Sequence, residues 1–272
     1  MYSPAEVARR YVETGKSKAA LPVGRMLLLG MLAGAFIALA GGSATFAVSY
    51  GGRLAGAAVF PAGLAMVLLA GSELFTGNCL LVIPLLERQL TWGRMLRSWG
   101  VVYLANVLGA GLVAALTVAA GTFDGVYESV VATAAAKAGL PFLTALLRGV
   151  LCNFLVCIAV WISFAAKDVA GKIAGLYFPI LLFVVSGFEH SVANMYYISV
   201  GLLAKGNAAW AAAAEEAGMD LTALTWGNFF GGNLLPVTLG NIVGGCAVGL
   251  VYWFCYLRNT GEKTPGGAAA RP

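Results

Sequence analysis

The stretch SGFEHSVANM, Ser186 to Met195, decides the fold because it interrupts a long apolar segment with polar groups. The surrounding segment, residues 173–204, reads IAGLYFPILLFVVSGFEHSVANMYYISVGLLA and is long enough to cross a bilayer. Glu189 and His190 are adjacent near its centre, and His190 is the only histidine in the chain. Ionisable residues are costly in such a segment and mark functional positions by default.

The first half of the chain carries a matching pattern. GSELFTGN (71–78) and GFEHSVAN (187–194) both read G-x-E-x-x-x-x-N. In each half TWG and then N-x-x-G follow, at 91–93 and 106–109 and again at 225–227 and 241–244. The glycine of TWG and the next motif's asparagine are 13 residues apart in one half and 14 in the other. Three motifs in the same order indicate an internal repeat.

The composition is that of a membrane protein. Of the 272 residues, 60% are hydrophobic and 11% are charged, whereas a soluble domain carries about 25% charged residues. Six apolar stretches are long enough to span a bilayer: residues 25–50, 57–86, 96–122, 142–166, 173–204 and 228–257. The sequence therefore predicts an all-α membrane protein whose six-span domain covers residues 25–258.

Three spans per repeat make the second copy enter the membrane from the opposite side, which is the inverted repeat common in transporters and channels. The polar motifs lie in spans two and five, so we expect these spans to be broken into half-helices near 73–78 and 187–194. Backbone groups freed at a break must be satisfied within the protein. We expect the carboxylates and amides of the two motifs to do this: Glu73, Asn78, Glu189 and Asn194. A direct role of the two glutamates in a proton path is the alternative.

His190 breaks the symmetry, because Leu74 occupies the matching position in the first half. Its imidazole titrates near physiological pH, which suits a group in a transport path. The alternative is a buried neutral histidine that holds the break closed. One histidine and separated glutamates are not a usual metal-ligand set, and the sequence contains no GxSxG, HExxH or CxxC, so we expect no metal, no cofactor and no enzymatic activity. The five cysteines all lie in apolar spans, where packing explains them.

The basic residues predict the orientation. If the N-terminus is cytoplasmic, 13 of the 17 lysines and arginines lie on the inner side, which follows the positive-inside rule. Both termini are then cytoplasmic, and the net charge of +5 needs no nucleic-acid partner. Residues 1–24 are too long and charged for a signal peptide and include a short surface helix, with Ser3 and Pro4 as its cap and first turn. Residues 259–272 are rich in Gly, Pro and Ala and are expected to be disordered.

Five strings together resemble the formate/nitrite transporter family: AGSELFTGN, TWG, RGVLCNFLVCIAVW, SGFEHSVANMYYI and NLLPVTLGNIVGG. The resemblance spans roughly residues 25–258. It implies an aquaporin-like fold with spans two and five broken, assembled as a homopentamer with one pore in each protomer, in the inner (cytoplasmic) membrane. It also implies a channel or transporter for formate, nitrite or hydrosulfide.

The resemblance assigns roles to individual residues. His190 matches the central pore histidine, Asn153 a pore asparagine and Lys137 an outer lysine that attracts anions. Thr91 matches a threonine of a flexible loop. The remaining matches are hydrophobic constrictions, with Phe75 and Phe183 on the outer side and, on the inner side, Leu90, Val156 and a position near Cys79 or Leu80.

Elementary electrostatics favours a weak-acid mechanism for such a pore. A bare anion enters an apolar constriction at high cost and is neutralised instead, and the conjugate bases of weak acids can take up a proton. We expect formate as substrate, with nitrite and hydrosulfide as alternatives and with the proton supplied through His190 or nearby water. A water or glycerol channel of the aquaporin type is disfavoured because the sequence lacks Asn-Pro-Ala motifs.

Overall fold

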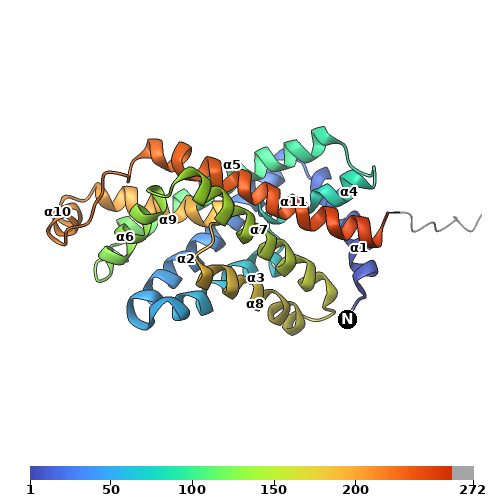
Figure 1. Cartoon of the computed structure of the whole chain (residues 1–272), viewed down its shortest axis with the longest axis horizontal. Helices are drawn as coiled ribbons and strands as arrows, with labels where there is room; N and C mark the ends of the chain where they lie inside the picture. The colour runs from blue at the N-terminus through green and yellow to red at the C-terminus, as the bar shows by residue number, and fades with distance from the viewer. Residues whose placement is uncertain (259–272) are drawn as a thin grey trace, which may run out of the picture.

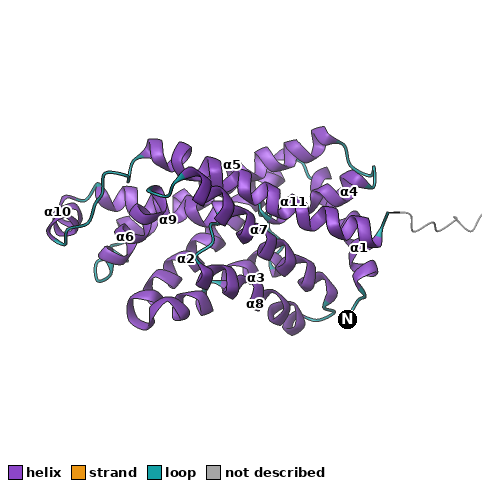
Figure 2. Cartoon of the chain, in the orientation of Figure 1, coloured by secondary structure: helices purple, strands orange, loops and turns teal. Residues whose placement is uncertain are grey.

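The structure is a computed structural model that describes residues 1–258, apart from the side chain of Glu215. The expected disordered tail, 259–272, lies outside the described residues. Within them every regular element is a helix and none is a strand (Figure 2). The predicted all-α class is confirmed.

The first half of the domain holds spans one to three. Span one is α2 (Val23–Val59), which turns at Gly52, where the backbone has a φ of 76° that favours glycine. Span two is broken into α3 (Pro61–Leu69) and the short helices η1 (Gly77–Leu81) and α4 (Val82–Leu86). Span three is α5 (Trp92–Ala119).

The second half repeats this plan. Span four is α7 (Phe142–Ala165), and span five is broken into α8 (Val169–Ser186) and α9 (Ser191–Lys205). Span six begins with the π-helical turn η2 (Asn228–Leu234) and continues as α11 (Leu235–Tyr256). Five stretches among the described residues are apolar and long enough to cross a membrane, and the first of them, Val23–Leu69, contains span one and the beginning of span two. Six spans with the second and fifth broken are therefore confirmed.

The break in span two begins earlier in the chain than the sequence predicts, and the break in span five begins at the predicted residue but is shorter. In span two the non-helical residues are 70–76, because Gly71 adopts a left-handed φ of 78° and ends α3. In span five they are 187–190, between the left-handed Gly187 and the start of α9. Asn78 and Asn194 therefore lie inside the helices that follow the breaks.

Glycines let spans one and three pack together, as they do spans four and six. A Cβ at Gly109 of α5 would overlap the carbonyl oxygen of Met31 in α2. A Cβ at Gly240 of α11 would overlap that of Leu146 in α7. The backbones of these helices thus touch in both halves, as small residues permit inside a membrane.

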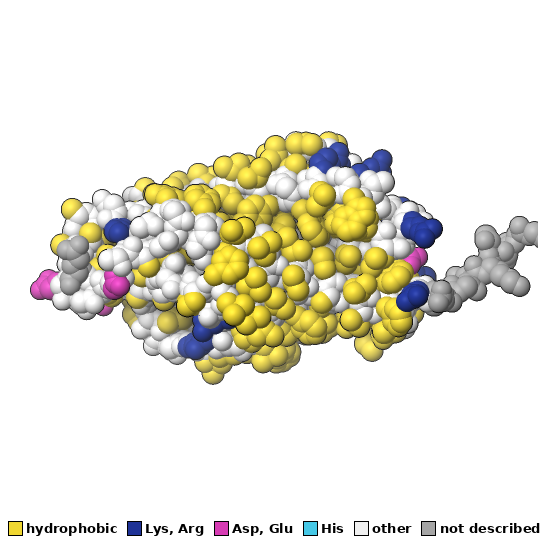
Figure 3. All heavy atoms as spheres, turned by 45° about the horizontal axis from the view of Figure 1, so that its top comes forward, with side chains coloured by type: hydrophobic (Ala, Val, Ile, Leu, Met, Phe, Trp, Pro, Cys, Tyr) yellow, Lys and Arg dark blue, Asp and Glu magenta, His cyan; other side chains and the backbone are white. Residues whose placement is uncertain are grey.

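Three further helices lie outside the spans. The predicted surface helix is α1 (Pro4–Ala20), which Ser3 caps, and α6 (Tyr127–Ala138) and α10 (Ala208–Glu216) follow spans three and five. In Figure 1, α6 and α10 lie at one end of the molecule and α1 and α4 at the other. Hydrophobic side chains cover the middle of the face seen in Figure 3, and lysines and arginines gather near the α1 end. This distribution is that of a multi-pass membrane protein.

Candidate functional site

Asn241 of α11 holds the break in span five. Its Nδ2 donates to the carbonyl oxygens of Gly149 (2.8 Å) and Glu189 (3.0 Å). Its Oδ1 accepts from the backbone N–H of Ser191 (2.9 Å). The side chain is fully buried, so one amide satisfies three buried backbone groups.

Asn106 of α5 holds the break in span two in the same way. Its Nδ2 donates to the carbonyl oxygens of Gly30 (2.7 Å) and Glu73 (3.0 Å). Its Oδ1 accepts from the N–H of Phe75 (2.9 Å). Phe75 and Ser191 are therefore equivalent positions in the two halves, which gives Leu74 and His190 as equivalents too. The inverted repeat extends to individual hydrogen bonds.

The glutamates of the two motifs do not accept from freed backbone N–H groups as predicted. Glu189 accepts from both Lys137 Nζ (3.0 Å to each oxygen) and Asn194 Nδ2 (2.6 Å). Its side chain is 4% exposed and that of Lys137 is 18% exposed. The buried carboxylate is thus paired with a lysine and an amide, while the freed backbone groups bond to Asn106 and Asn241.

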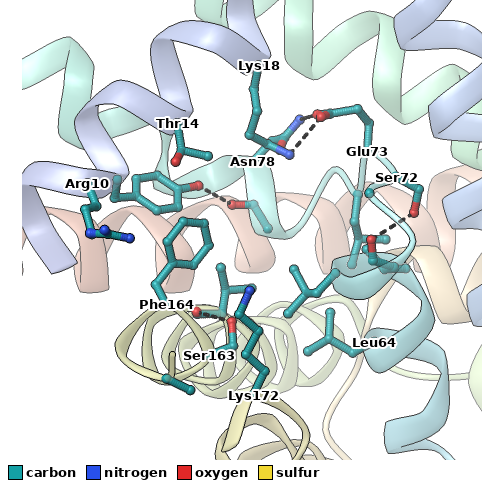
Figure 4. A pocket seen from close by; sticks show the side chains of 18 residues that line it. Arg10, Thr14, Lys18, Leu64, Ser72, Glu73, Asn78, Ser163, Phe164 and Lys172 are labelled. Atoms are coloured by element: carbon teal, nitrogen blue, oxygen red, sulfur yellow. Dashed lines mark hydrogen bonds and ion pairs between the residues drawn. The ribbon is translucent and has the colours of Figure 1, made fainter. Parts of the chain in front are cut away.

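Glu73 has the matching partners in the first half. It accepts from Lys18 Nζ of α1 (2.9 Å) and from Asn78 Nδ2 (2.8 Å). Figure 4 shows Lys18, Glu73 and Asn78 pointing toward one another at the edge of a cavity. Each break therefore carries a Lys–Glu–Asn cluster, with its lysine from a helix outside the spans.

His190 lies between the two halves. Its Nδ1 accepts from the backbone N–H of Ala193 (3.1 Å), which caps α9. Because an N–H donates to Nδ1, a neutral ring carries its proton on Nε2. Nε2 lies 2.8 Å from Thr76 Oγ1, so the ring donates to this hydroxyl. The imidazole is 3% exposed and contacts the ring of Phe183, with centroids 5.9 Å apart.

Two cavities flank the contact between His190 and Thr76. The α6-side cavity, about 260 Å³, is lined by His190, Phe60 and Phe183, and by the hydroxyl residues Thr45, Ser129 and Thr133. The α1-side cavity, about 320 Å³, is lined by Leu64, Leu74 and Gly77, and by the charged residues Arg10, Lys18, Glu73 and Lys172 (Figure 4). Gly77 directly follows Thr76, so the histidine faces one cavity and its partner lies beside the other.

The structure brings together several of the expected pore residues. Phe183 packs edge-on against Phe60, with centroids 5.6 Å apart, beside His190. Asn153 is fully buried and donates to the carbonyl oxygens of Thr76 (3.2 Å) and Asn241 (2.7 Å), which joins the two breaks. Val156, one turn further along α7, is buried in the same core.

Other expected residues lie elsewhere. Thr91 is exposed and caps α5, where its Oγ1 accepts from the N–H of Arg94 (3.4 Å). Leu90 packs with Ala19, Leu81 and Met95, and Leu80 packs in a second cluster beneath α1.

The ring of Phe75 contacts Tyr103 and Trp99 and does not contact Phe183. Neither cavity is lined by Phe75, Leu80, Leu90 or Thr91.

Five residues at the site were not singled out from the sequence as pore or site residues: Phe60, Thr76, Lys18, Asn106 and Asn241. Asn106 and Asn241 belong to the repeated N-x-x-G motifs, so their matched positions were a usable signal. Thr76 lies inside the GSELFTGN motif. Lys18 and Phe60 carry no local pattern and are identified only by their three-dimensional contacts.

The chain matches known proteins over nearly its whole length. The sequence model described as "Formate/nitrite transporter" matches residues 5–254. A probable formate transporter of Methanothermobacter thermautotrophicus is 39% identical, over 94% of this chain and 97% of the relative. The formate channel FocA of Escherichia coli K12 is 36% identical, over 94% of both chains.

Solved structures agree with this match. A structure described as an FNT family ion channel aligns with a TM-score of 0.80 and 28% identity, over 92% of this chain and 98% of the other. A pentameric formate channel with formate bound aligns with a TM-score of 0.76 and 32% identity, over 87% of this chain and 98% of the other. The chain belongs to the formate/nitrite transporter family.

Proposed function

We propose that the chain is a membrane channel or transporter for small monovalent anions of weak acids, with formate as its main substrate. It assembles as a homopentamer in which each protomer has its own path. Two observations support this: a single histidine lies between two cavities, and relatives of similar length are formate channels, one of them pentameric with formate bound.

The path is short and apolar at its centre. Phe60 and Phe183 narrow it on the α6 side, and Leu64 and Leu74 line it on the α1 side. A bare anion loses its hydration in such a section at a high cost in free energy. Formic acid and nitrous acid are neutral and small, so uptake of a proton removes most of this cost. A formate anion that enters a cavity therefore takes up a proton and crosses the centre as formic acid.

His190 lowers the barrier as a hydrogen-bond donor. Its Nε2–H, which donates to Thr76 Oγ1 in the structure, donates instead to a substrate oxygen. The Thr76 hydroxyl donates to the same anion. In an imidazolium, Nδ1 would carry a proton that points at the N–H of Ala193 and could no longer accept its hydrogen bond. The ring therefore stays neutral while Nδ1 caps α9. The proton that neutralises the substrate is therefore drawn from cavity water, next to the ring, and crosses with the substrate as electroneutral symport.

The α1 end, with its lysines and arginines, faces the cytoplasm in this proposal. Both termini then lie inside the cell, and the membrane is the inner (cytoplasmic) one. The charge distribution along the sequence supports this orientation. The only reaction involved is reversible proton transfer to the substrate, so the protein acts as a transporter and not as an enzyme.

Flux into liposomes that contain only the purified protein tests the function. Formate, nitrite and hydrosulfide are presented separately at about pH 5.5 and pH 7.5, and membrane current is recorded in parallel. We expect formate flux that rises at low pH without net current. Flux accompanied by current and independent of pH contradicts the symport mechanism, and the absence of flux with all three anions contradicts the function.

Two threonine variants separate the pore from its surroundings. Thr76→Ala removes the partner of His190, and we expect it and His190→Asn to slow formate flux, while the remaining flux still rises at low pH because the proton comes from cavity water. Thr91→Ala is the matched control, because Thr91 is exposed and caps α5 away from both cavities. Equal flux in Thr76→Ala and Thr91→Ala would show that the contact between Thr76 and His190 has no role in transport.

A further inference from the structure

The lysine of the α6-side cavity is not free to attract an anion. Both oxygens of Glu189 lie 3.0 Å from Lys137 Nζ, and the glutamate is 4% exposed. Moving Lys137 toward a passing anion would leave a buried carboxylate without its partner, which is strongly unfavourable. Lys137 and Glu189 together contribute no net charge to the cavity.

Arg53 also lines this cavity, and its positive charge is not paired with an acidic side chain among the described residues. It is exposed, and within residues 1–258 its guanidinium has no hydrogen bond and no ion pair. Among the described residues, the charged side chains that line the cavity are those of Arg53 and Lys137. Because Lys137 is neutralised by Glu189, the positive charge of the cavity comes from Arg53.

Two glycines allow the guanidinium of Arg53 to lie at the α6-side cavity. Gly52, with a φ of 76°, turns the chain so that Arg53 starts the last part of α2. A Cβ at Gly187 would lie 2.5 Å from Nη2 of Arg53, so the absence of a side chain there makes room for the guanidinium. Gly187 ends α8 three residues before His190. The guanidinium thus lies over the break that carries the pore histidine.

We propose that Arg53 is the substrate-collecting and specificity-determining residue of the α6-side entrance, and that it favours planar anions with two oxygens. This inference rests on the proposed function. A guanidinium presents a planar fork of N–H donors that binds a carboxylate through two parallel hydrogen bonds. Formate and nitrite match this fork, whereas hydrosulfide and chloride each offer a single acceptor atom. The hydroxyls of Ser129 and Thr133 line the same cavity and donate to the anion that Arg53 holds, whereas Thr45 Oγ1 already donates to the carbonyl oxygen of Gly41 (3.1 Å).

The size of the effect follows from Coulomb's law. A unit charge about 5 Å from an anion, at a dielectric constant of about 80, changes the local anion concentration about four-fold. This attraction is screened by salt, with a Debye length of about 10 Å at 0.1 M ionic strength. Loss of Arg53 should therefore raise KM by about four-fold at low salt, and by less at high salt, while the maximal rate stays within about two-fold.

The test compares Arg53→Gln, Arg53→Lys and the parent by initial formate influx from the α6 side, at about 10 mM and 300 mM ionic strength. Arg148→Gln is the matched control, since Arg148 is an exposed arginine that lines neither cavity. We expect Arg53→Gln to raise KM and to lose the salt dependence. Arg53→Lys should keep the salt dependence but lower the preference for formate over hydrosulfide. Unchanged KM, salt dependence and anion preference in both Arg53 variants overturn the proposal.

A binding measurement separates this proposal from the proposed function. Line broadening of ¹³C-formate in NMR reports equilibrium binding to the purified protein without any transport. A parent that broadens the signal more than Arg53→Gln supports the Arg53 site even if no flux is found. Equal broadening by the parent, Arg53→Gln and Arg148→Gln rejects the site, whatever the flux shows. A thermal unfolding scan of each variant confirms that it is folded.

Discussion

Replacement of Asn241 by leucine tests the central physical claim about the fold, that one buried amide holds each broken span. Leucine has a similar volume, so the change removes hydrogen bonds with little change in packing. Three bonds are lost, two donated to Gly149 and Glu189 and one accepted from Ser191. At roughly 0.6–1.5 kcal/mol per bond, the loss in free energy of unfolding is about 2–5 kcal/mol.

The assay is equilibrium unfolding in detergent micelles, followed by tryptophan fluorescence, with two comparison variants. Asn106→Leu removes the equivalent three bonds in span two and should cost a similar amount. Asn228→Leu is the control, because Asn228 is only half-buried and donates its amide to one backbone oxygen, that of Ala223 (2.9 Å). Its loss should cost about 1 kcal/mol or less.

Asn241→Leu should also impair transport. Asn241 fixes Glu189 and Ser191 on either side of His190, so Asn241→Leu should reduce formate flux even at temperatures where the protein stays folded. A free-energy loss below about 1 kcal/mol for Asn241→Leu, or one equal to that of Asn228→Leu, would refute the reasoning. The break would then be held by packing alone.

Two further predictions concern packing and pH. Gly244→Ala should destabilise the protein by about 1–3 kcal/mol in the same unfolding assay, because the added Cβ would overlap the backbone of Val150 in α7. Gly231→Ala is the control and should be close to neutral, because a Cβ there would meet open space. Equal effects of the two would mean that α7 and α11 can separate freely. At the start of α1, the backbone N–H and hydroxyl of Ser3 donate to Glu6 and hold the pKa of its carboxyl below the usual value. Because the folded pKa is lowered, this stabilisation is present above about pH 4.3 and is lost as the pH falls through the folded value. The protection factors of the amides in the first turn of α1, which are exchange rates corrected for the intrinsic rate at each pH, should therefore fall at low pH in the parent and show no such step in Glu6→Gln.

The sequence was sufficient for the spans and the repeat because both are local signals. Apolar length predicts a membrane span, and a motif that recurs with matched spacing predicts an equivalent break. The break in span two starts a few residues before the predicted position because the left-handed Gly71 ends α3, whereas the left-handed Gly187 ends α8 at the predicted residue. The side chain of His190 then starts α9. These conformations depend on single residues and carry no periodic signal.

The site was harder to predict because its contacts join residues far apart in the chain. Thr76 and His190 are 114 positions apart, and Lys18 and Glu73 are 55 apart. Thr91 matched a family position by local order alone, yet the structure places it on the surface, and Thr76 meets the histidine instead. Linear spacing gives no information on which of two nearby threonines faces the opposite half.

The polar contact at the centre uses positions that the repeat does not pair. Leu74 is the equivalent of His190, and two residues further along Thr76 is the equivalent of Val192, which is fully buried. Each half thus supplies one polar and one apolar residue, so the hydrogen bond between His190 and Thr76 forms once. A symmetric pair of histidines would set two donors against each other across the same narrow section. The duplicated asparagine, glutamate and lysine contacts support both breaks, and the two positions whose counterparts are apolar, His190 and Thr76, form a single polar contact at the buried centre.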